Sequence, residues 1–310
     1  MTLSPDDLSF LAQAYGWDVF TFVTLHEGEN TTYRLTTSAG QVAVRRYRSG
    51  RYTPTEVNAE LEWLAALKDA VPVVPALYTR SGARCVVGPD ETSEVYAAFP
   101  YIVGDEPDPP TPSDFEQLGK LSRQLHGAAA NILETRPGSW AGYQRPTYDL
   151  QTVVGSLEAL LQTPLLDRAC KQRCVVLAER LGELYETCKP AEGFVHADLH
   201  FGNVLVSGDI WGDIWTLLDF DECGFGFSAF DLGTVRFHAL ARGQDEGWEA
   251  FLAGYGNPLP TALELQLGTA MKIFYTLGKL PFRLDVPEVR NNASGLLQKY
   301  LRMIEQLVRS

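Results

Sequence analysis

The first hundred residues alternate short runs of β-branched and aromatic residues with turn-forming residues. Runs of this kind, when Gly, Asn and Ser bound them, predict β-strands, and short connections predict antiparallel neighbours. A further pair of strands is expected to end in the segment EVYAAFPYIVG, close to Val103–Gly104. The sequence therefore predicts a small antiparallel sheet whose first strands are Val19–Leu25, Thr32–Thr37 and Gln41–Tyr47, joined by the turns GEN and SAG.

Helical periodicity accounts for most of the remaining chain. A helix that begins after Thr53–Pro54 carries apolar residues three and four positions apart. The acidic, proline-rich segment Asp105–Asp114 is the clearest linker, and Ser113 is the expected N-cap of the helix FEQLGKLSRQLHGAA that follows it. The same apolar period predicts later helices over Asp149–Leu161, Leu165–Cys188, Ala229–Arg242, Gly247–Tyr255, Thr261–Leu280 and Val289–Val308.

These elements predict an α+β protein with two lobes, residues 1–103 and residues 104–310. The first is expected to hold the small sheet and one helix, and the second to be mainly helical. One segment, Glu192–Glu222, interrupts the helices with two strand-like pieces, FVHADLHFGNVLV and IWTLLDFDE, joined by the turn GDIWGD. His, Asp and Asn side chains gather at the ends of these pieces, so we expect the chemistry of the protein there.

Composition and charge exclude several classes of protein. Hydrophobic residues make up 45% of the 310 residues and charged residues 21%, which is typical of a globular protein. We find no apolar run near the roughly 18 residues of a membrane helix, and the acidic start is unlike a secretory signal, so a cytoplasmic protein is expected. A net charge of −13 argues against nucleic acid or a membrane as a partner. The five scattered cysteines indicate neither disulfides nor a cysteine zinc site.

The interrupting segment contains a pattern suited to phosphoryl transfer. It reads His196-Ala-Asp198-Leu-His200-Phe-Gly-Asn203 and continues to Asp219. Transfer from a nucleotide needs a carboxylate near the attacking hydroxyl, and an amide oxygen and a second carboxylate to hold Mg²⁺ against the phosphates. In this interpretation Asp198 orients the hydroxyl and accepts its proton, while Asn203 and Asp219 are ligands of Mg²⁺ in an ATP complex.

At these residues the chain resembles the aminoglycoside phosphotransferase-like kinases, which also include choline, fructosamine and homoserine kinases and bacterial stress-response kinases. The family pattern H-G-D-x-x-x-x-N has Ala197 in place of Gly, its I-D-[WF] segment matches Asp219, and its D-L-A segment matches Asp231. The resemblance runs from about Phe20 to Tyr255. It implies a two-lobed protein-kinase-like fold, with ATP bound between a sheet lobe and a helical lobe.

The resemblance also implies nucleotide-binding residues in the first lobe. Ala43 and Arg45 lie two apart and share one face of a strand, so the small side chain leaves room for adenine while the cation reaches the phosphates. Arg45 replaces the usual Lys. Glu60 is its expected partner, and the alternative for Glu60 is a solvated charge on the helix surface.

Two further segments complete the expected nucleotide site. The family has a G-x-x-N turn in this place, and Gly28, Asn30 and Thr31 are expected to offer backbone N–H groups to phosphate; a plain hairpin turn explains these residues equally well. The hinge is expected at Phe99–Ile102, where Pro100 has no N–H. The nucleotide-facing hinge residues are therefore Phe99, Tyr101 and Ile102.

Neighbouring polar residues have structural interpretations. We expect His196 to support the catalytic loop, Asp231 to cap loop N–H groups, and Asp221 to be an exposed loop carboxylate. The helical spacing of Met271, Phe274 and Tyr275 indicates core positions.

Other functions stay open at this point. His196, Asp198 and His200 alternate, so on a strand they would share one face and could form a metallohydrolase site with Asp219 and His238. A nucleotide-binding pseudokinase is a third interpretation. For a kinase, the acidic residues of the second lobe favour a small cationic alcohol as the acceptor, and the stretch RSGRYTPTEVNAELEWL resembles stress-response kinases that act on protein Ser/Thr hydroxyls.

Overall fold

The computed structural model describes residues 3–28, 30–88, 94–136, 143–164, 166–209, 212–284 and 286–308. The chain forms two compact units, and each unit is built from three separate segments of the sequence. The first unit comprises Met1–Pro107, Glu134–Arg145 and Gly202–Asp221, and the second Asp108–Leu133, Pro146–Phe201 and Glu222–Ser310. The lobe boundary expected at residues 103–104 stays a prediction.

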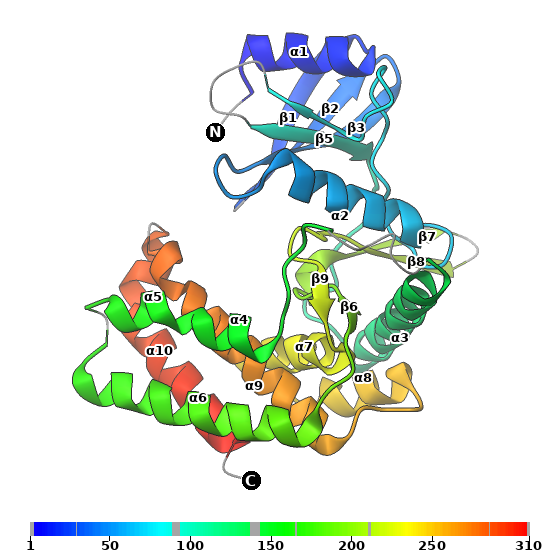
Figure 1. Cartoon of the computed structure of the whole chain (residues 1–310). Helices are drawn as coiled ribbons and strands as arrows, with labels where there is room; N and C mark the ends of the chain where they lie inside the picture. The colour runs from blue at the N-terminus through cyan, green and yellow to red at the C-terminus, as the bar shows by residue number, and fades with distance from the viewer. Residues whose placement is uncertain are drawn as a thin grey trace. The chain divides into compact units, whose positions relative to one another are not determined.

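The first unit contains the predicted antiparallel sheet. Its strand order is β1-β2-β3-β5-β4, and every neighbouring pair is antiparallel. The helices α1 and α2 lie on opposite sides of this sheet (Figure 1). The α+β fold class is therefore confirmed. The strands are β1 (Val19–Glu27), β2 (Thr31–Thr37), β3 (Gly40–Tyr47), β4 (Cys85–Val87) and β5 (Val95–Pro100).

Reciprocal capping boxes begin both helices of this sheet. In α2 (Pro54–Leu67) the Thr53 hydroxyl accepts from the Glu56 N–H, while the Glu56 carboxylate accepts from the Thr53 N–H. Ser4 does the same for α1 (Pro5–Tyr15). The apolar period predicted no helix at α1, because it buries just two of its described side chains, Leu11 and Tyr15. The Ser-Pro-x-Asp cap is the signal that identifies it.

A hairpin from the second half of the sequence also belongs to the first unit. It consists of β7 (Val204–Asp209) and β8 (Gly212–Leu217), is preceded by the 3-10 turn η1 (Phe201–Asn203), and has turn residues 210 and 211 outside the described residues. Leu217 donates its N–H to the Pro72 carbonyl, 2.9 Å away. On the other strand of the hairpin, Asp105 forms an antiparallel bridge with Val206. These backbone bonds attach the hairpin to segments that precede it by more than one hundred residues.

The second unit is mainly helical and surrounds α9. This helix (Ala262–Lys279) contacts α4, α5, α6, α7 and α10 (Figure 1). Most of its side chains are buried. Strands β6 (Gly193–Val195) and β9 (Gly224–Gly226) form an antiparallel pair. The other elements are α3 (Pro112–Thr135), α4 (Leu150–Gly155), α5 (Leu157–Gln162), α6 (Arg168–Cys188), α7 (Ser228–Arg242), α8 (Gly247–Tyr255), η2 (Leu280–Arg283) and α10 (Pro287–Leu307).

Some helix boundaries differ from the prediction. Ser113 is not the N-cap of α3, because the helix begins at Pro112 and Thr111 forms the reciprocal bonds with Asp114. The helix expected over 149–161 is broken at Ser156, whose hydroxyl donates to the Val153 carbonyl. The predicted start of the next helix, Leu165, lies outside the described residues. Within the described segments, no helix combines the length and hydropathy needed to cross a membrane. All five cysteines are free thiols.

The contact between α7 and α9 predicts the effect of a glycine substitution. A Cβ atom at Gly233 would lie 2.3 Å from the backbone of Gly268 and Thr269, so the two helices must separate to admit it. We expect Gly233→Ala to lower the free energy of unfolding by about 1–3 kcal/mol, the usual cost of overpacking. Urea denaturation measures the change.

The matched control is Gly127→Ala, on an exposed part of α3 with open space around the added methyl. It should raise the free energy of unfolding by about 0.5–1 kcal/mol through helix propensity. Equal effects of the two substitutions would show that the α7–α9 contact is looser than described.

Candidate active site

The loop after β6 carries Asp198 in the second unit, and its backbone takes a strained turn. Ala197 has φ 67°, in the left-handed region that an alanine adopts at a cost of about 1–2 kcal/mol. The buried carboxylate of Asp231 accepts the N–H of His196 at 2.8 Å and the N–H of Ala197 at 2.7 Å. The His196 ring is buried, and its Nδ1 accepts the N–H of Asp198 at 3.3 Å. These bonds hold the turn in place.

A histidine from α3 completes the surroundings of Asp231. His126 Nε2 lies 3.0 Å from Asp231 Oδ2, and its Nδ1 lies 3.0 Å from the Tyr255 hydroxyl. Burial opposes ionisation of Asp231, but His126, His196 and the backbone N–H bonds together hold its pKa below the ordinary value. The carboxylate therefore stays charged at neutral pH, with donors on both of its oxygens.

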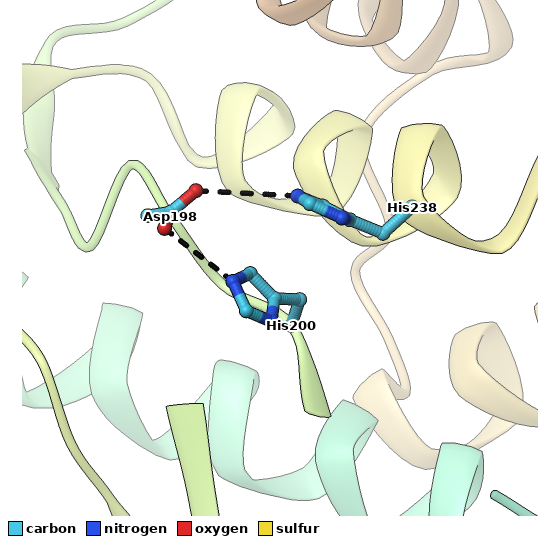
Figure 2. A group of neighbouring side chains, drawn as sticks. All are labelled: Asp198, His200 and His238. Atoms are coloured by element: carbon cyan, nitrogen blue, oxygen red, sulfur yellow. Dashed lines mark ion pairs between the residues drawn. The ribbon is translucent and has the colours of Figure 1, made fainter. Parts of the chain in front are cut away.

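Asp198 lies among basic side chains. His200 Nε2 is 3.4 Å from Oδ2 and His238 Nε2 is 4.0 Å from Oδ1 (Figure 2). Lys272 Nζ is 3.0 Å from Oδ1. Burial raises the pKa of Asp198, but Lys272, His200 and His238 outweigh it and hold the pKa well below its usual value. Burial and the nearby His200 and Lys272 hold the pKa of His238 well below its usual value, against the opposing effect of Asp198. The Asp198 side chain is 32% exposed, so an ionised carboxylate is accessible to a small molecule.

Asp198, His200 and His238 are close enough to share a cation, but two observations argue against a metallohydrolase centre. The Lys272 ammonium already donates a hydrogen bond to Oδ1 of Asp198, the carboxylate that such a centre needs as a ligand. His196, the first member of the alternating pattern, points its Nδ1 at its own loop instead of at this group. A shared face for His196, Asp198 and His200 required an extended strand, whereas the loop turns at Ala197.

The expected metal ligands lie at one end of the β7–β8 hairpin, in the first unit. Val204 pairs with Leu217, and the Asn203 carbonyl accepts the Leu218 N–H at 2.9 Å, so the residues flanking the pair are brought together. Asp219 has φ 59° and a side chain that is 38% exposed. One amide oxygen and one carboxylate at the end of a rigid hairpin are donors of the kind that Mg²⁺ prefers, so the residues fit this ion.

Arg45 connects this end of the hairpin with the sheet and α2. Its Nη1 lies 2.8 Å from Asp219 Oδ1 and 3.8 Å from Glu60 Oε1. Glu60 is buried and also accepts from the Tyr47 hydroxyl at 3.1 Å, so the solvated-charge interpretation of Glu60 is wrong. Burial raises the pKa of Glu60, against the opposing effect of Arg45 and Arg145. The expected pair with Glu60 is present, but the shorter contact of Arg45 is with Asp219.

The prediction for Asp221 is wrong, because this carboxylate is buried. Its Oδ2 accepts from Asn30 Nδ2 at 2.8 Å and from the Tyr52 hydroxyl at 3.3 Å. Arg145 donates to the carbonyls of Phe220 and Asp221 and, at 3.2 Å, to that of Glu56. The segment Asp219–Asp221 is therefore attached to the turn before β2 and to α2.

The other residues expected to bind nucleotide lie in β3, in β5 and directly after it, and around the turn before β2. Ala43 is opposite Phe99 in the β3–β5 register, and Tyr101 and Ile102 follow β5 directly. The Gly28 N–H donates to the Asn30 carbonyl at 3.1 Å, as in a plain hairpin turn. Asn30 Oδ1 accepts the Arg48 N–H at 3.1 Å, so both ends of this side chain are used within the protein. Thr31 begins β2 opposite Arg46.

Three residues that contact the site were not expected from the sequence: Lys272, His126 and Arg145. Each acts on a partner more than seventy residues away, which local periodicity does not reveal. Lys272 still gives a weak signal, because it is a lone charge among the apolar residues AMKIFYTL of α9. A buried cation in such a run needs an anionic or carbonyl partner.

Comparisons with known proteins show the family and the fold of the chain. A family model for the phosphotransferase enzyme family matches residues 23–265. A protein of Deinococcus radiodurans is 31% identical over 273 residues, which cover 83% of this chain and 75% of that protein. The structure of a microcompartment-associated aminopropanol kinase has a TM-score of 0.81 and 26% identity, and covers 97% of this chain and 98% of its own.

An amicoumacin kinase in complex with AMP-PNP and Ca²⁺ has a TM-score of 0.75 at 20% identity, covering 96% of this chain and 92% of its own. The kinase-like fold and the family resemblance predicted from the sequence are confirmed.

Arg45 and its neighbour Arg46 provide a test of this arrangement. Arg45→Ala removes the cation beside Asp219 and Glu60, so nucleotide affinity should fall by about 10- to 100-fold, as for a lost charged hydrogen bond. Arg46 lies on the opposite strand face, over the Tyr33 ring and 3.7 Å from Glu94. Arg46→Ala should lower the melting temperature with little effect on affinity. Calorimetry and thermal denaturation distinguish the two; the reverse pattern would contradict the assignment of Arg45.

Proposed function

This chain belongs to the phosphotransferase enzyme family, and from that premise we propose that it transfers the γ-phosphate of ATP, with Mg²⁺, to a hydroxyl of a small amino alcohol. The observation that carries the proposal is the accessible, ionised Asp198 in a loop of fixed conformation. A carboxylate so placed can accept a hydrogen bond from an acceptor hydroxyl and take up its proton. A reaction that consumes ATP favours a cytoplasmic setting.

On the nucleotide side, Asn203 and Asp219 would hold Mg²⁺. The ion would neutralise charge on the transferring phosphoryl group. The chain's own contribution is to orient these donors: the β7–β8 hairpin fixes Asn203, and Arg45 holds Asp219 from the sheet. The kinase complex with AMP-PNP and Ca²⁺ supports the use of a nucleotide and a divalent cation by this fold.

The base of ATP would lie against Ala43 and the segment after β5. Ala43 and Phe99 are opposite each other, and the N–H of Tyr101 or Ile102 would donate to the adenine edge. Gly28 and Asn30 have a weaker part in this proposal, because their polar groups already bond within the protein. Thr31, at the start of β2, is the remaining member of the predicted phosphate turn.

An amino alcohol is favoured as the acceptor by two observations. The aminopropanol kinase is similar over nearly the whole chain at 26% identity. The second unit also carries exposed carboxylates at Asp245, Glu246 and Glu249 that favour a cation by long-range attraction. Glu222, another carboxylate of the second unit, already pairs with Lys279.

The proposal is tested by measuring ATP consumption with a panel of acceptors. The panel contains 1-amino-2-propanol, ethanolamine, choline, an aminoglycoside, a neutral sugar and a basic protein, each with and without Mg²⁺. We expect turnover with an amino alcohol that requires Mg²⁺, and a phosphomonoester product by ³¹P NMR. Phosphorylation of the protein alone would indicate a protein kinase, and ATP binding without any product would indicate a pseudokinase.

We expect asparagine substitutions of Asp198 and Asp219 to impair different properties of the enzyme. Asp198→Asn is nearly isosteric and leaves Asn203 and Asp219 in place, so ATP affinity should be kept while kcat falls by about 10²-fold or more. Asp219→Asn removes a ligand charge, so Mg²⁺-dependent ATP binding and kcat should both fall.

Calorimetry of ATP binding at fixed Mg²⁺, beside a steady-state assay, measures both variants. Loss of metal-dependent binding in Asp198→Asn, with binding kept in Asp219→Asn, would mean that the two roles are exchanged.

A further inference from the structure

Lys272 is a buried cation inside the core of the second unit. Its side chain is 5% exposed on α9, whose neighbouring residues Met271 and Ile273 are fully buried and apolar. An ammonium group in such surroundings is costly unless its charge and donors are satisfied. The structure gives it two acceptors, both in the loop of Asp198: the Ala197 carbonyl at 2.7 Å and Asp198 Oδ1 at 3.0 Å.

The two acceptors make Lys272 the counterpart of Asp231. Asp231 accepts the N–H of Ala197, and Lys272 donates to its carbonyl, so both polar groups flanking the left-handed residue are bound from within the core. Glycine would take this conformation without strain, but this chain has an alanine. Clamping the residue at both ends therefore offsets the strain that its side chain introduces.

We propose that Lys272 is a positioning residue for phosphoryl transfer: it holds Ala197 in the left-handed turn and Oδ1 of Asp198, and thereby directs Oδ2 toward the acceptor hydroxyl. This inference rests on the proposed function. Lys272 itself does not touch the reacting atoms; it acts through Asp198. The other basic groups that face Asp198 are His200 and His238, and the His196 ring accepts its N–H.

The test compares Lys272→Met with Lys299→Met. Lys299 also donates to a backbone carbonyl, that of Ala241 at 2.9 Å, but on α10. Lys272→Met should lower kcat at least tenfold with less than a threefold change in KM for ATP, whereas Lys299→Met should leave both within twofold. Unchanged kcat in folded Lys272→Met would overturn the proposal. If the Met variant does not fold, Lys272→Gln, which keeps a donor but loses the charge, replaces it with the same expectations.

Two rescue measurements distinguish positioning from packing. Lys272→Arg keeps the charge and should recover part of kcat. Ala197→Gly in the Lys272→Met background should raise kcat at least threefold, because glycine takes the turn unaided. A packing role predicts recovery by neither change, so failure of both rescues would overturn the proposal.

A last readout does not depend on activity. The titration of Asp198, followed by ¹³C NMR of aspartate-labelled protein, should move to higher pH in Lys272→Met and stay unchanged in Lys299→Met, because loss of a nearby cation favours the protonated acid. An unmoved titration would contradict the contact itself. If the wild-type protein transfers no phosphate but the titration moves, the proposed function fails while the contact stands.

Discussion

The buried carboxylate of Asp231 is the constraint on which the loop of Asp198 depends. It has no access to solvent, so its charge must be compensated by donors from the protein. His126 supplies one donor from α3, and the N–H groups of His196 and Ala197 supply two from the loop. The loop cannot leave this arrangement without exposing a buried charge to an apolar core. The strained turn at Ala197 is thus a consequence of satisfying Asp231.

Charge is distributed differently around the two acidic residues with proposed roles. Asp198 faces Lys272, His200 and His238, which keep it ionised and leave it partly accessible. Asp219 faces Arg45, which is shared with the buried Glu60. The first arrangement suits a group that accepts a hydrogen bond and a proton. The second suits a group that binds a cation while a fixed neighbour holds its orientation.

Local patterns predicted much of the fold and the site. Strands of the sheet and the helix α2 follow from alternation, apolar spacing and caps, which are properties of neighbouring residues. The segment from His196 to Asn203 was identified because its chemistry lies within eight positions. Helix α1 was missed because its apolar face is short, and the break at Ser156 because a single glycine, Gly155, does not by itself end a helical pattern.

Contacts between residues far apart in the sequence could not be predicted from such local patterns. Asp221 was expected to be exposed because nothing near it in the sequence indicates Asn30 or Tyr52 as partners. Lys272 pairs with Asp198 across seventy-four positions, a separation that the fold of the second unit closes. Predicting such a pair requires knowledge of which helix faces which loop, and that is decided by the packing of α9 among its neighbours.

Amide hydrogen exchange at Ala197, measured by NMR on the full chain, tests the central claim most directly. The N–H of Ala197 lies in a loop, where exchange is ordinarily fast, yet the structure buries it against Asp231. The account predicts that it exchanges as slowly as the core amides of α9, and that Asp231→Asn releases it. Exchange at the rate of an exposed loop in the wild-type protein would contradict the claim that Asp231 fixes the turn at Ala197.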